Sequence, residues 1–175
     1  MKKSIAFCLL LMPAAAAAET WMVTSSTLTY TVSHPLHGSK GVSHAVRGEG
    51  VCDEEGCAFL VAAPVNTFLS GDRNRDLHMI EVVRGAQFPM ISVQGRLPKP
   101  SSGTFVADLE VEFAGRKAVY KTVSFTVDER SETGLRFHGI VPATLADFKI
   151  TPPSLLGMPV KNEIPVNVEF SWSKS

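Results

Sequence analysis

Histidine side chains are the best candidates for chemistry in this chain, because imidazole binds transition metals and exchanges protons near neutral pH. His34, His37 and His44 lie close in sequence, and the spacing of the first two could place both imidazoles at one strand end. The remaining histidines are His78 and His138. No cysteine, and no carboxylate at a matching offset, completes a ligand set. We expect no bound metal or other cofactor, while a His-based metal-binding protein stays open as an alternative to polar loop residues.

Two further segments have the residue types of an active site but not its spacing. Residues 41–45 place Ser43 next to His44, but they lack the second glycine of a nucleophile elbow and lie in a predicted strand. The cluster of Asp72, Arg73, Arg75 and Asp76 suits helix capping and surface ion pairs better than contact with a ligand head group. No glycine-rich phosphate loop is present. We therefore expect no catalytic residues and no enzymatic activity.

The spacing of two cysteines predicts a disulfide. Cys52 and Cys57 are separated by Asp-Glu-Glu-Gly, which is a turn-like sequence. Directly opposed residues of an antiparallel hairpin lie close enough to bond, and an even pair favours a disulfide in an oxidising compartment. Closing so short a loop would stabilise the fold by about 2 kcal/mol.

The N-terminus has the composition of a cleavable export signal. Lys2 and Lys3 precede an apolar run over residues 5–12, and Ala16 and Ala18 then form an A-x-A arrangement. The run is far shorter than the ~20 residues that span a bilayer. We expect residues 1–18 to be removed, residues 19–175 to form one domain, and the mature protein to be periplasmic without stable membrane insertion.

The charge of the mature chain would be nearly balanced. The full chain has 17 basic and 17 acidic side chains, and removing Lys2 and Lys3 would leave 15 basic ones. Nucleic acids and anionic membrane surfaces attract concentrated basic patches. The composition therefore argues against nucleic acid as a partner.

Alternation of apolar and polar residues dominates the mature chain and predicts β-strands with one dry face. The alternation is clearest over residues 104–113, 117–127 and 163–172, and weaker over 27–33, 42–51, 57–65, 89–97 and 134–145. Eight closely spaced strands favour an antiparallel sheet that closes as a barrel or folds as a sandwich. The ten phenylalanines, most of them at inward positions, leave both a solid core and a ligand cavity open.

One segment breaks the strand pattern and predicts a helix. Over residues 71–89 the apolar spacing becomes helical, with Leu77, Met79, Ile80 and Val83 on one side. Asp72 or Asn74 can cap its start. We predict a helix at about 74–85 that lays its apolar side across one end of the barrel.

These segments, in this order, resemble the YceI family of secreted, polyisoprenoid-binding proteins. The most specific stretch covers residues 66–93, in which a strand and a polar turn lead into a helix with an Arg-Asp-x-His-Met sequence and then a Phe-Pro pair. Residues 145–150 (LADFKI) are a second match, and residues 29–50 are a looser one. Together the matches cover nearly the whole mature chain.

The resemblance implies an eight-stranded antiparallel lipocalin-like β-barrel whose elongated apolar cavity holds a polyisoprenoid or another long-chain amphiphile. It implies neither catalysis nor a metal. Asp76, His78 and Met79 of the helix, the pair of Phe88 and Pro89, and Phe148 fall on its motifs. The cysteine pair departs from the family pattern, and Arg136 and His138 make one side of their strand polar.

We therefore expect a non-catalytic periplasmic lipid-binding protein whose helix gates one end of the cavity. The residues expected to line that cavity are Leu28, Tyr30, Val32, Met79, Ile80, Val83, Phe88, Phe105, Leu109, Phe113, Phe125, Phe137, Phe148, Phe170 and Trp172. An envelope barrel with a solid core, which binds partners through its loops, stays open as an alternative. The sequence also leaves open the identity of the lipid and the oligomeric state, including a homodimer.

Overall fold

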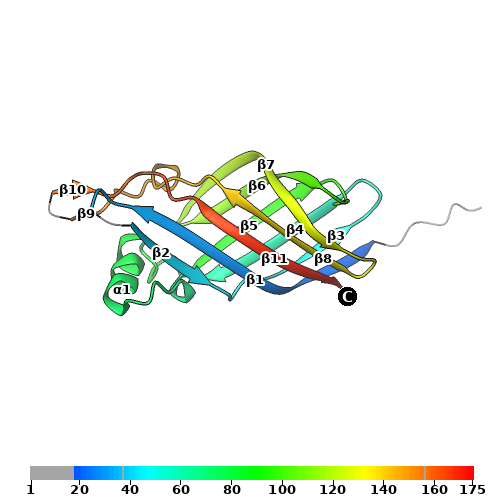
Figure 1. Ribbon diagram of the computed structural model, residues 1–175, viewed down its shortest axis with the longest axis horizontal. Coiled ribbons are helices and arrows are strands. Elements are labelled where there is room, and N and C mark those ends of the chain that lie inside the picture. Colours follow the sequence, from blue (N-terminus) through cyan, green and yellow to red (C-terminus); the bar gives the residue numbers. More distant parts are fainter. Residues whose placement is uncertain (1–17, 37, 156) are drawn as a thin grey trace, which may run out of the picture.

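The computed structural model describes residues 18–36, 38–155 and 157–175, and most of its regular structure is β (Figure 1). The predicted signal peptide, apart from Ala18, lies outside these residues. The strands are β1 (Glu19–Ser33), β2 (Gly38–Ser43), β3 (Arg47–Cys52), β4 (Cys57–Pro64), β5 (Met90–Leu97), β6 (Thr104–Phe113), β7 (Arg116–Arg130), β8 (Gly134–Val141), β9 (Ser154–Leu155), β10 (Met158–Pro159) and β11 (Val166–Lys174). The helical elements are η1 (Val65–Thr67), α1 (Arg73–Val82) and η2 (Ala146–Phe148).

The main sheet closes on itself as an eight-stranded antiparallel barrel, as predicted. The order β11-β8-β7-β6-β5-β4-β3-β1 is completed by the pairing of β1 with β11. The additional strand β2 pairs with β1 in the register of β3, because Met22 opposes Glu49 and, six residues further along, Leu28 opposes Ser43. β2 and β3 are therefore two parts of one interrupted wall strand.

The first strand is longer than the sequence pattern indicates. β1 begins at Glu19, whereas the alternation predicts a strand only from residue 27. The register between β1 and β11 shifts between Val23 and Ser25, so a bulge interrupts the period of two in this half of the strand. The bulge hides the alternation on which the prediction depends.

The helix begins as predicted but contacts the barrel less extensively. The Asp72 carboxylate caps α1 by accepting hydrogen bonds from the backbone N–H groups of Asn74 and Arg75, at 2.9 and 3.0 Å. α1 ends at Val82, before the predicted end at about residue 85. The prediction that Leu77 packs on the apolar side of the helix is wrong, because this residue is 55% exposed. Only the last turn, with Met79 and Ile80, and the buried Val83 beyond it pack against the core.

Side chains fill the end of the barrel that carries α1. Phe148 of η2 is almost fully buried, and its ring meets the ring of Phe113 edge-on with centroids 5.2 Å apart. Phe68 is also buried and lies against Tyr30, with ring centroids 5.9 Å apart. This end of the barrel is therefore a packed core.

A polar contact fixes the η2 loop that delivers Phe148 to this core. The Tyr120 hydroxyl donates a hydrogen bond to Asp147 Oδ2 over 2.7 Å, and the Thr144 backbone N–H donates to the same oxygen over 2.9 Å. Burial opposes ionisation of Asp147, but the hydrogen bonds from Tyr120 and Thr144 outweigh it and lower the pKa of that carboxyl. Burial, followed by the hydrogen bond to Asp147, raises the pKa of Tyr120. The ionised carboxylate thus ties β7 to the loop.

We expect the Tyr120–Asp147 contact to stabilise the fold by about 1 kcal/mol at pH 7. Because the pKa of Asp147 is lower in the folded chain than in the unfolded chain, this stabilisation is present above the ordinary carboxyl pKa of ~4 and is lost as the pH falls through the folded value. A double-mutant cycle of Tyr120→Phe and Asp147→Ala, followed by urea unfolding at pH 7 and pH 3, measures the coupling. A coupling of equal size at both pH values would contradict the role of the charge.

Candidate functional site

A cavity of about 140 Å³ lies inside the half of the barrel opposite α1. All eight wall strands contribute to its lining, since each supplies inward side chains at every second position. Two small lining residues leave this space unfilled. Ala107 lies between Phe105 and Leu109 on β6, and Gly50 lies on β3. The cavity is apolar throughout its depth and reaches solvent at the end away from the helix.

One wall of the cavity is a connected row of aromatic rings. Phe105 stacks on Phe125 with ring centroids 5.3 Å apart, and Phe137 meets both rings edge-on at 5.2 and 5.6 Å. Phe170 continues the row at 5.7 Å from Phe137, and Trp172 follows at 6.3 Å. Gly139 makes this packing possible, because a Cβ at that position would lie 2.4 Å from Cδ1 of Phe125. The row gives the cavity a large wall that holds its shape.

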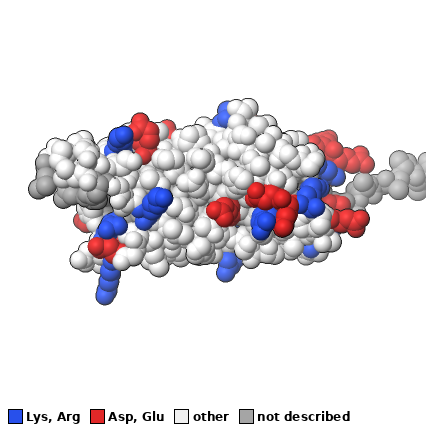
Figure 2. All heavy atoms as spheres, in the orientation of Figure 1, with Lys and Arg blue, Asp and Glu red and all other residues white. Residues whose placement is uncertain are grey.

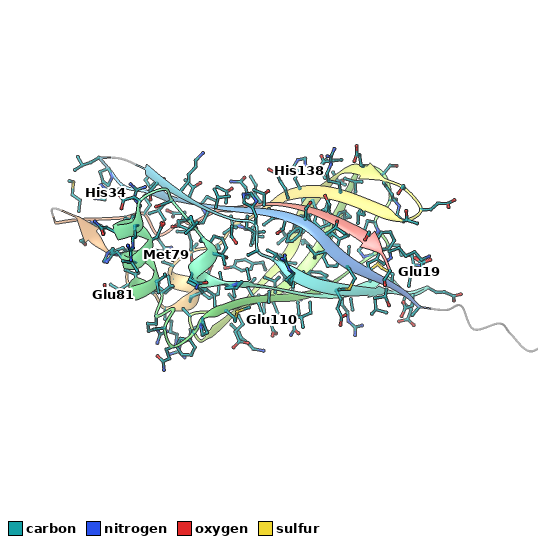
Figure 3. All side chains as sticks on the ribbon, turned by 90° about the horizontal axis from the view of Figure 1, so that it is seen from below. Glu19, His34, Met79, Glu81, Glu110 and His138 are labelled. Carbon is teal, nitrogen blue, oxygen red and sulfur yellow. A yellow bond between two sulfur atoms is a disulfide. The ribbon has the colours of Figure 1, made fainter. Side chains whose placement is uncertain are left out.

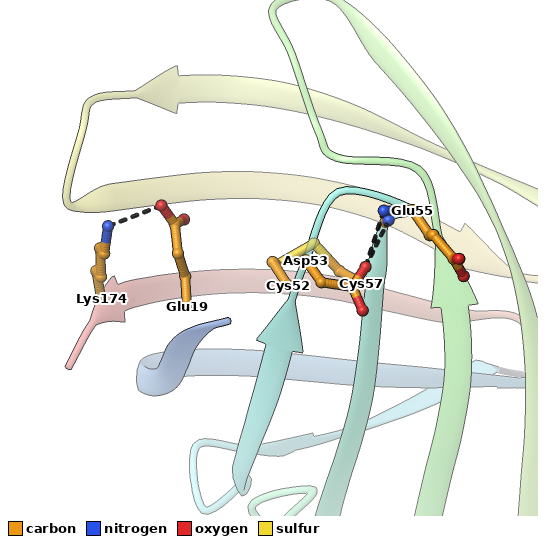
Figure 4. Close-up of a disulfide and its surroundings, with 7 residues drawn as sticks. Glu19, Cys52, Asp53, Glu55, Cys57 and Lys174 are labelled. Carbon is orange, nitrogen blue, oxygen red and sulfur yellow. Dashed lines mark hydrogen bonds and ion pairs between the residues drawn. A yellow bond between two sulfur atoms is a disulfide. The ribbon is translucent and has the colours of Figure 1, made fainter. Parts of the chain in front are cut away.

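Charged side chains occur only at the mouth of the cavity. Among the lining residues these are Glu19, Lys99 and Arg130, and acidic and basic side chains gather at this end of the molecule (Figure 2). Glu19 forms an ion pair with Lys174 at 2.8 Å, which joins the start of β1 to the end of β11 (Figure 4). The hydrogen bond from Lys174 lowers the pKa of Glu19. The mouth is thus wet and charged, whereas the interior is apolar.

A disulfide forms part of the same mouth. Cys52 and Cys57 are directly opposed at the turn between β3 and β4, and both side chains line the cavity (Figure 4). The turn is held by Asp53, whose Oδ1 accepts backbone hydrogen bonds from Glu55 at 2.9 Å and Gly56 at 3.2 Å. The predicted disulfide is confirmed. It clamps two neighbouring wall strands where the cavity opens.

Comparison with known proteins yields matches in structure. No protein-family model matches the sequence, and no curated protein matches it. A polyisoprenoid-binding domain from Saccharophagus degradans, implicated in plant cell wall breakdown, matches with a TM-score of 0.70 at 13% identity, covering 89% of this chain and 98% of that chain. BcnA of Burkholderia cenocepacia matches with a TM-score of 0.70 at 12% identity, covering 83% and 95%.

The YceI protein of Campylobacter jejuni matches over 100% of this chain and 93% of that chain, with a TM-score of 0.57 at 10% identity. The chain has the YceI fold. At these identities the likeness concerns the fold alone. None of the described helices is long and apolar enough to span a membrane.

Within the YceI fold, the residues predicted to line a cavity divide into two groups. Seven of them line the cavity described here: Leu28, Phe105, Leu109, Phe125, Phe137, Phe170 and Trp172. The other eight are absent from its lining: Tyr30, Val32, Met79, Ile80, Val83, Phe88, Phe113 and Phe148. Figure 3 shows why, since Met79 of α1 lies at one end of the molecule and Glu19 of the mouth at the other. The helix therefore does not gate this cavity.

Residues in and just after the helix that match the family motif have structural contacts instead. Asp76 accepts hydrogen bonds from the backbone N–H and the hydroxyl of Ser70, at 2.9 and 2.6 Å. His78 is exposed and lies 3.6 Å from Glu81. Phe88 covers the turn between β6 and β7, where its ring occupies the space that a Cβ on Gly115 would need. These contacts position the helix end of the barrel.

Several lining residues escaped the sequence analysis. Trp21 lies in the bulged half of β1, where no strand is predicted, and Lys99 lies in an irregular loop. Phe59 and Val61 belong to a weakly patterned strand whose intervening residues, Ala58 and Leu60, are apolar as well, so alternation gives no signal for the inward face there. Lys99 and Arg130 have no periodic signal at all.

The histidines do not assemble a metal site among the residues that the structure describes, in which no group of three or more His, Cys, Asp or Glu side chains could hold an ion. His34 Nδ1 accepts a hydrogen bond from the Leu36 backbone N–H, so its Nε2 donates to the Met158 carbonyl over 3.0 Å. His44 instead contacts Thr27 and the Ser26 carbonyl of β1. These residues precede His34 by about seven positions along an extended chain. This offset of ~20 Å prevents His34 and His44 from sharing one ion. His37 lies outside the described residues.

We expect loss of the disulfide to lower the free energy of unfolding by about 2 kcal/mol, because the short loop it closes is constrained in the unfolded chain. Urea unfolding of the double variant Cys52→Ala/Cys57→Ala, compared with the oxidised parent, measures the loss. The parent in excess reductant is the matched control and should unfold like the variant. A variant as stable as the oxidised parent would contradict the stabilising role.

Proposed function

We propose that this chain is an exported, YceI-like protein that holds the apolar chain of a long-chain lipid, such as a polyisoprenoid, inside the barrel without reacting with it. The observation that carries the proposal is the cavity with an apolar interior and charged residues at one end of its lining. The structural likeness to a domain described as polyisoprenoid-binding supports the same ligand class. The proposal includes membership of the YceI family.

The size of the cavity limits how much of such a ligand can be buried, and therefore its affinity. Burial contributes up to ~0.8 kcal/mol per CH₂, so ten of them would supply about 8 kcal/mol, or near-micromolar affinity before ordering costs. The cavity of about 140 Å³ is smaller than the ~300–1,000 Å³ of pockets for drug-sized ligands. It accepts one segment of a long chain, and a deeper position requires side chains such as Phe148 to move.

The chemistry of the lining supports binding rather than catalysis. Its two cysteines are joined in the disulfide, and its lining includes no histidine, aspartate, serine or threonine. The single lining carboxylate, Glu19, is paired with Lys174. A buried nucleophile or general base next to the ligand chain is therefore missing among the described lining residues.

Export to the periplasm is part of the proposal and has two supports. Residues 1–18 have the pattern of a cleavable signal, and the disulfide suits an oxidising compartment. Cleavage after Ala18 would start the mature chain at the first residue of β1.

Native mass spectrometry of the protein purified from its own cells tests both parts of the proposal. We expect a polypeptide mass that begins at Glu19, in a near one-to-one complex with a long-chain amphiphile that organic extraction then identifies. A bare polypeptide that also fails to take up isoprenoids or fatty amides would favour a solid-core barrel that binds partners through its loops. Recovery of residues 1–18 in the mature protein would contradict export by cleavage.

Filling the cavity should prevent binding. Ala107 points inward and is 3% exposed, whereas its neighbour Val106 points outward and is 46% exposed. We expect Ala107→Phe to weaken binding of geranylgeraniol at least about tenfold, because the new ring occupies the ligand space, while the matched control Val106→Phe leaves affinity within about twofold. Both tryptophans of the chain line the cavity, so their intrinsic fluorescence reports the titration.

Overpacking can cost about 1–3 kcal/mol of stability, so urea unfolding of both variants accompanies the titration. A folded Ala107→Phe variant with unchanged affinity would show that the lipid chain does not occupy the cavity.

A further inference from the structure

The end of the barrel that carries α1 also has an exposed apolar tip, which consists of residues 34–36 after β1 and residues 157–160 around β10. Two hydrogen bonds hold these segments together. His34 Nε2 donates to the Met158 carbonyl over 3.0 Å, and the Lys161 backbone N–H donates to the Ser33 carbonyl over 2.8 Å. β10 lies at the extremity of the molecule opposite the C-terminus (Figure 1).

The described side chains of the tip are mostly apolar and accessible to solvent. Pro35, Leu36 and Pro159 are exposed, and Leu36 is 58% exposed although it is a large aliphatic residue. The described atoms at this extremity are uncharged (Figure 2). An exposed aliphatic side chain gains free energy when it enters another apolar phase, and such surfaces mark interaction sites.

Lysines are the charges nearest to the tip along its own segments. Lys161 follows the tip directly, and Lys40 lies opposite Thr31, two residue pairs behind the end of the β1–β2 hairpin. Both lysines are exposed, and within the described ranges neither forms an ion pair. The sequence around them has no acidic residue over 20–48 or over 148–162.

The carboxylates of this end lie behind the tip or are balanced by cations. Glu163 opposes Thr144, on the side of Lys161 away from the tip, and Asp147 accepts a hydrogen bond from Tyr120 on β7. The acidic residues of α1 and its cap are equalled in number by basic residues of the same segment: Asp72, Asp76 and Glu81 against Arg73, Arg75 and Arg84. The local charge next to the tip is therefore positive.

We propose that the tip docks the protein on the surface of a bilayer that contains anionic phospholipids. Leu36 enters the interface, while Lys40 and Lys161 contact lipid phosphates from just behind it. Lysine suits this place because its aliphatic stem accompanies the apolar side chains and its ammonium group stays among the head groups. A bilayer, unlike a protein partner, receives a small convex apolar point without a complementary groove.

Docking through the tip points the cavity mouth away from the bilayer. His34 beside the tip and Glu19 at the mouth lie at opposite ends of the molecule (Figure 3). The inference therefore concerns a surface separate from the cavity and does not depend on what the cavity binds.

Flotation of the mature protein with vesicles tests the docking. We expect the protein to float with vesicles made of equal parts of phosphatidylcholine and phosphatidylglycerol, and to stay behind with vesicles of phosphatidylcholine alone. Binding to the mixed vesicles should fall as salt screens the lysines. Equal binding to both kinds of vesicle would overturn the role of the charges.

Variants of the tip locate the contact. Leu36→Ser should weaken binding to the mixed vesicles at least about fivefold, and Lys40→Gln/Lys161→Gln at least about tenfold. Leu60→Ser is the control for the leucine, because Leu60 is 52% exposed on β4 and lies outside both the tip and the cavity lining.

The control for the charges is Arg96→Gln/Lys121→Gln, which removes two exposed cations from the outer wall of β5 and β7. Both controls should bind within about twofold of the parent. Urea unfolding of every variant shows that the fold is kept. Losses in the controls as large as those in the tip variants would overturn the assignment to the tip.

Fluorescence reports the orientation of the docked protein. Trp21 and Trp172 of the parent both line the cavity, so they contribute equally to Leu36→Trp and Leu60→Trp. Mixed vesicles should shift the emission of Leu36→Trp to shorter wavelengths and leave that of Leu60→Trp unchanged. The opposite result would show that the barrel wall, and not the tip, faces the lipid.

The remaining outcomes separate docking from self-association and from the proposed function. A protein that ignores both kinds of vesicle, but forms a dimer that Leu36→Ser dissociates in size-exclusion chromatography, would identify a second copy of the chain as the partner and overturn the inference. None of these results tests the lipid in the cavity, which native mass spectrometry and Ala107→Phe address.

Discussion

Pairing of β1 with β11 closes the barrel, and the interior space depends on that closure. The pairing runs from Trp21 opposite Lys174 to Tyr30 opposite Val166, and the Glu19–Lys174 ion pair extends it to the rim. Eight antiparallel strands fix an interior that is just wide enough for side chains or for one small ligand. Because the width of the barrel is fixed, the size of the inward residues decides, at each position along the barrel axis, whether side chains fill the interior or leave space for a ligand. Phe113 and Phe148 fill the helix end, whereas Ala107 and Gly50 leave space at the other end.

The sequence predicts those parts of the barrel in which alternation is uninterrupted. β6 and β11 alternate cleanly, so their inward phenylalanines could be assigned to the interior from the pattern alone. The start of β1 could not be predicted, because the bulge after Val23 shifts the period. Leu77 shows the same limit for helices. Its spacing fits the apolar side of α1, but the helix meets the barrel only near its C-terminal end, a fact of tertiary packing that spacing does not contain.

The position of the cavity also could not be predicted from the sequence, because it depends on tertiary packing. Inward residues are equally apolar at both ends of the barrel, and the pattern cannot say which end is filled. That depends on η2, which reaches the core through the Tyr120–Asp147 contact and brings Phe148 with it. The charged residues of the mouth come from a loop and a strand end, where no periodicity exists. The cysteine spacing, in contrast, contained enough information to predict the clamp at the rim.

The difference between the two ends determines how an amphiphile can enter. At the helix end a head group would have to lose its hydration among Phe113, Phe148 and Tyr30, and burial of an unpaired charge costs several kcal/mol. At the mouth the same group would stay in water, beside the charged residues of the rim. An apolar chain would gain free energy from burial in the interior, whereas its head group would keep its hydration at the rim. Under the proposed function we therefore expect such a molecule to enter tail first, and we expect the packed helix end to limit how deeply the tail can enter.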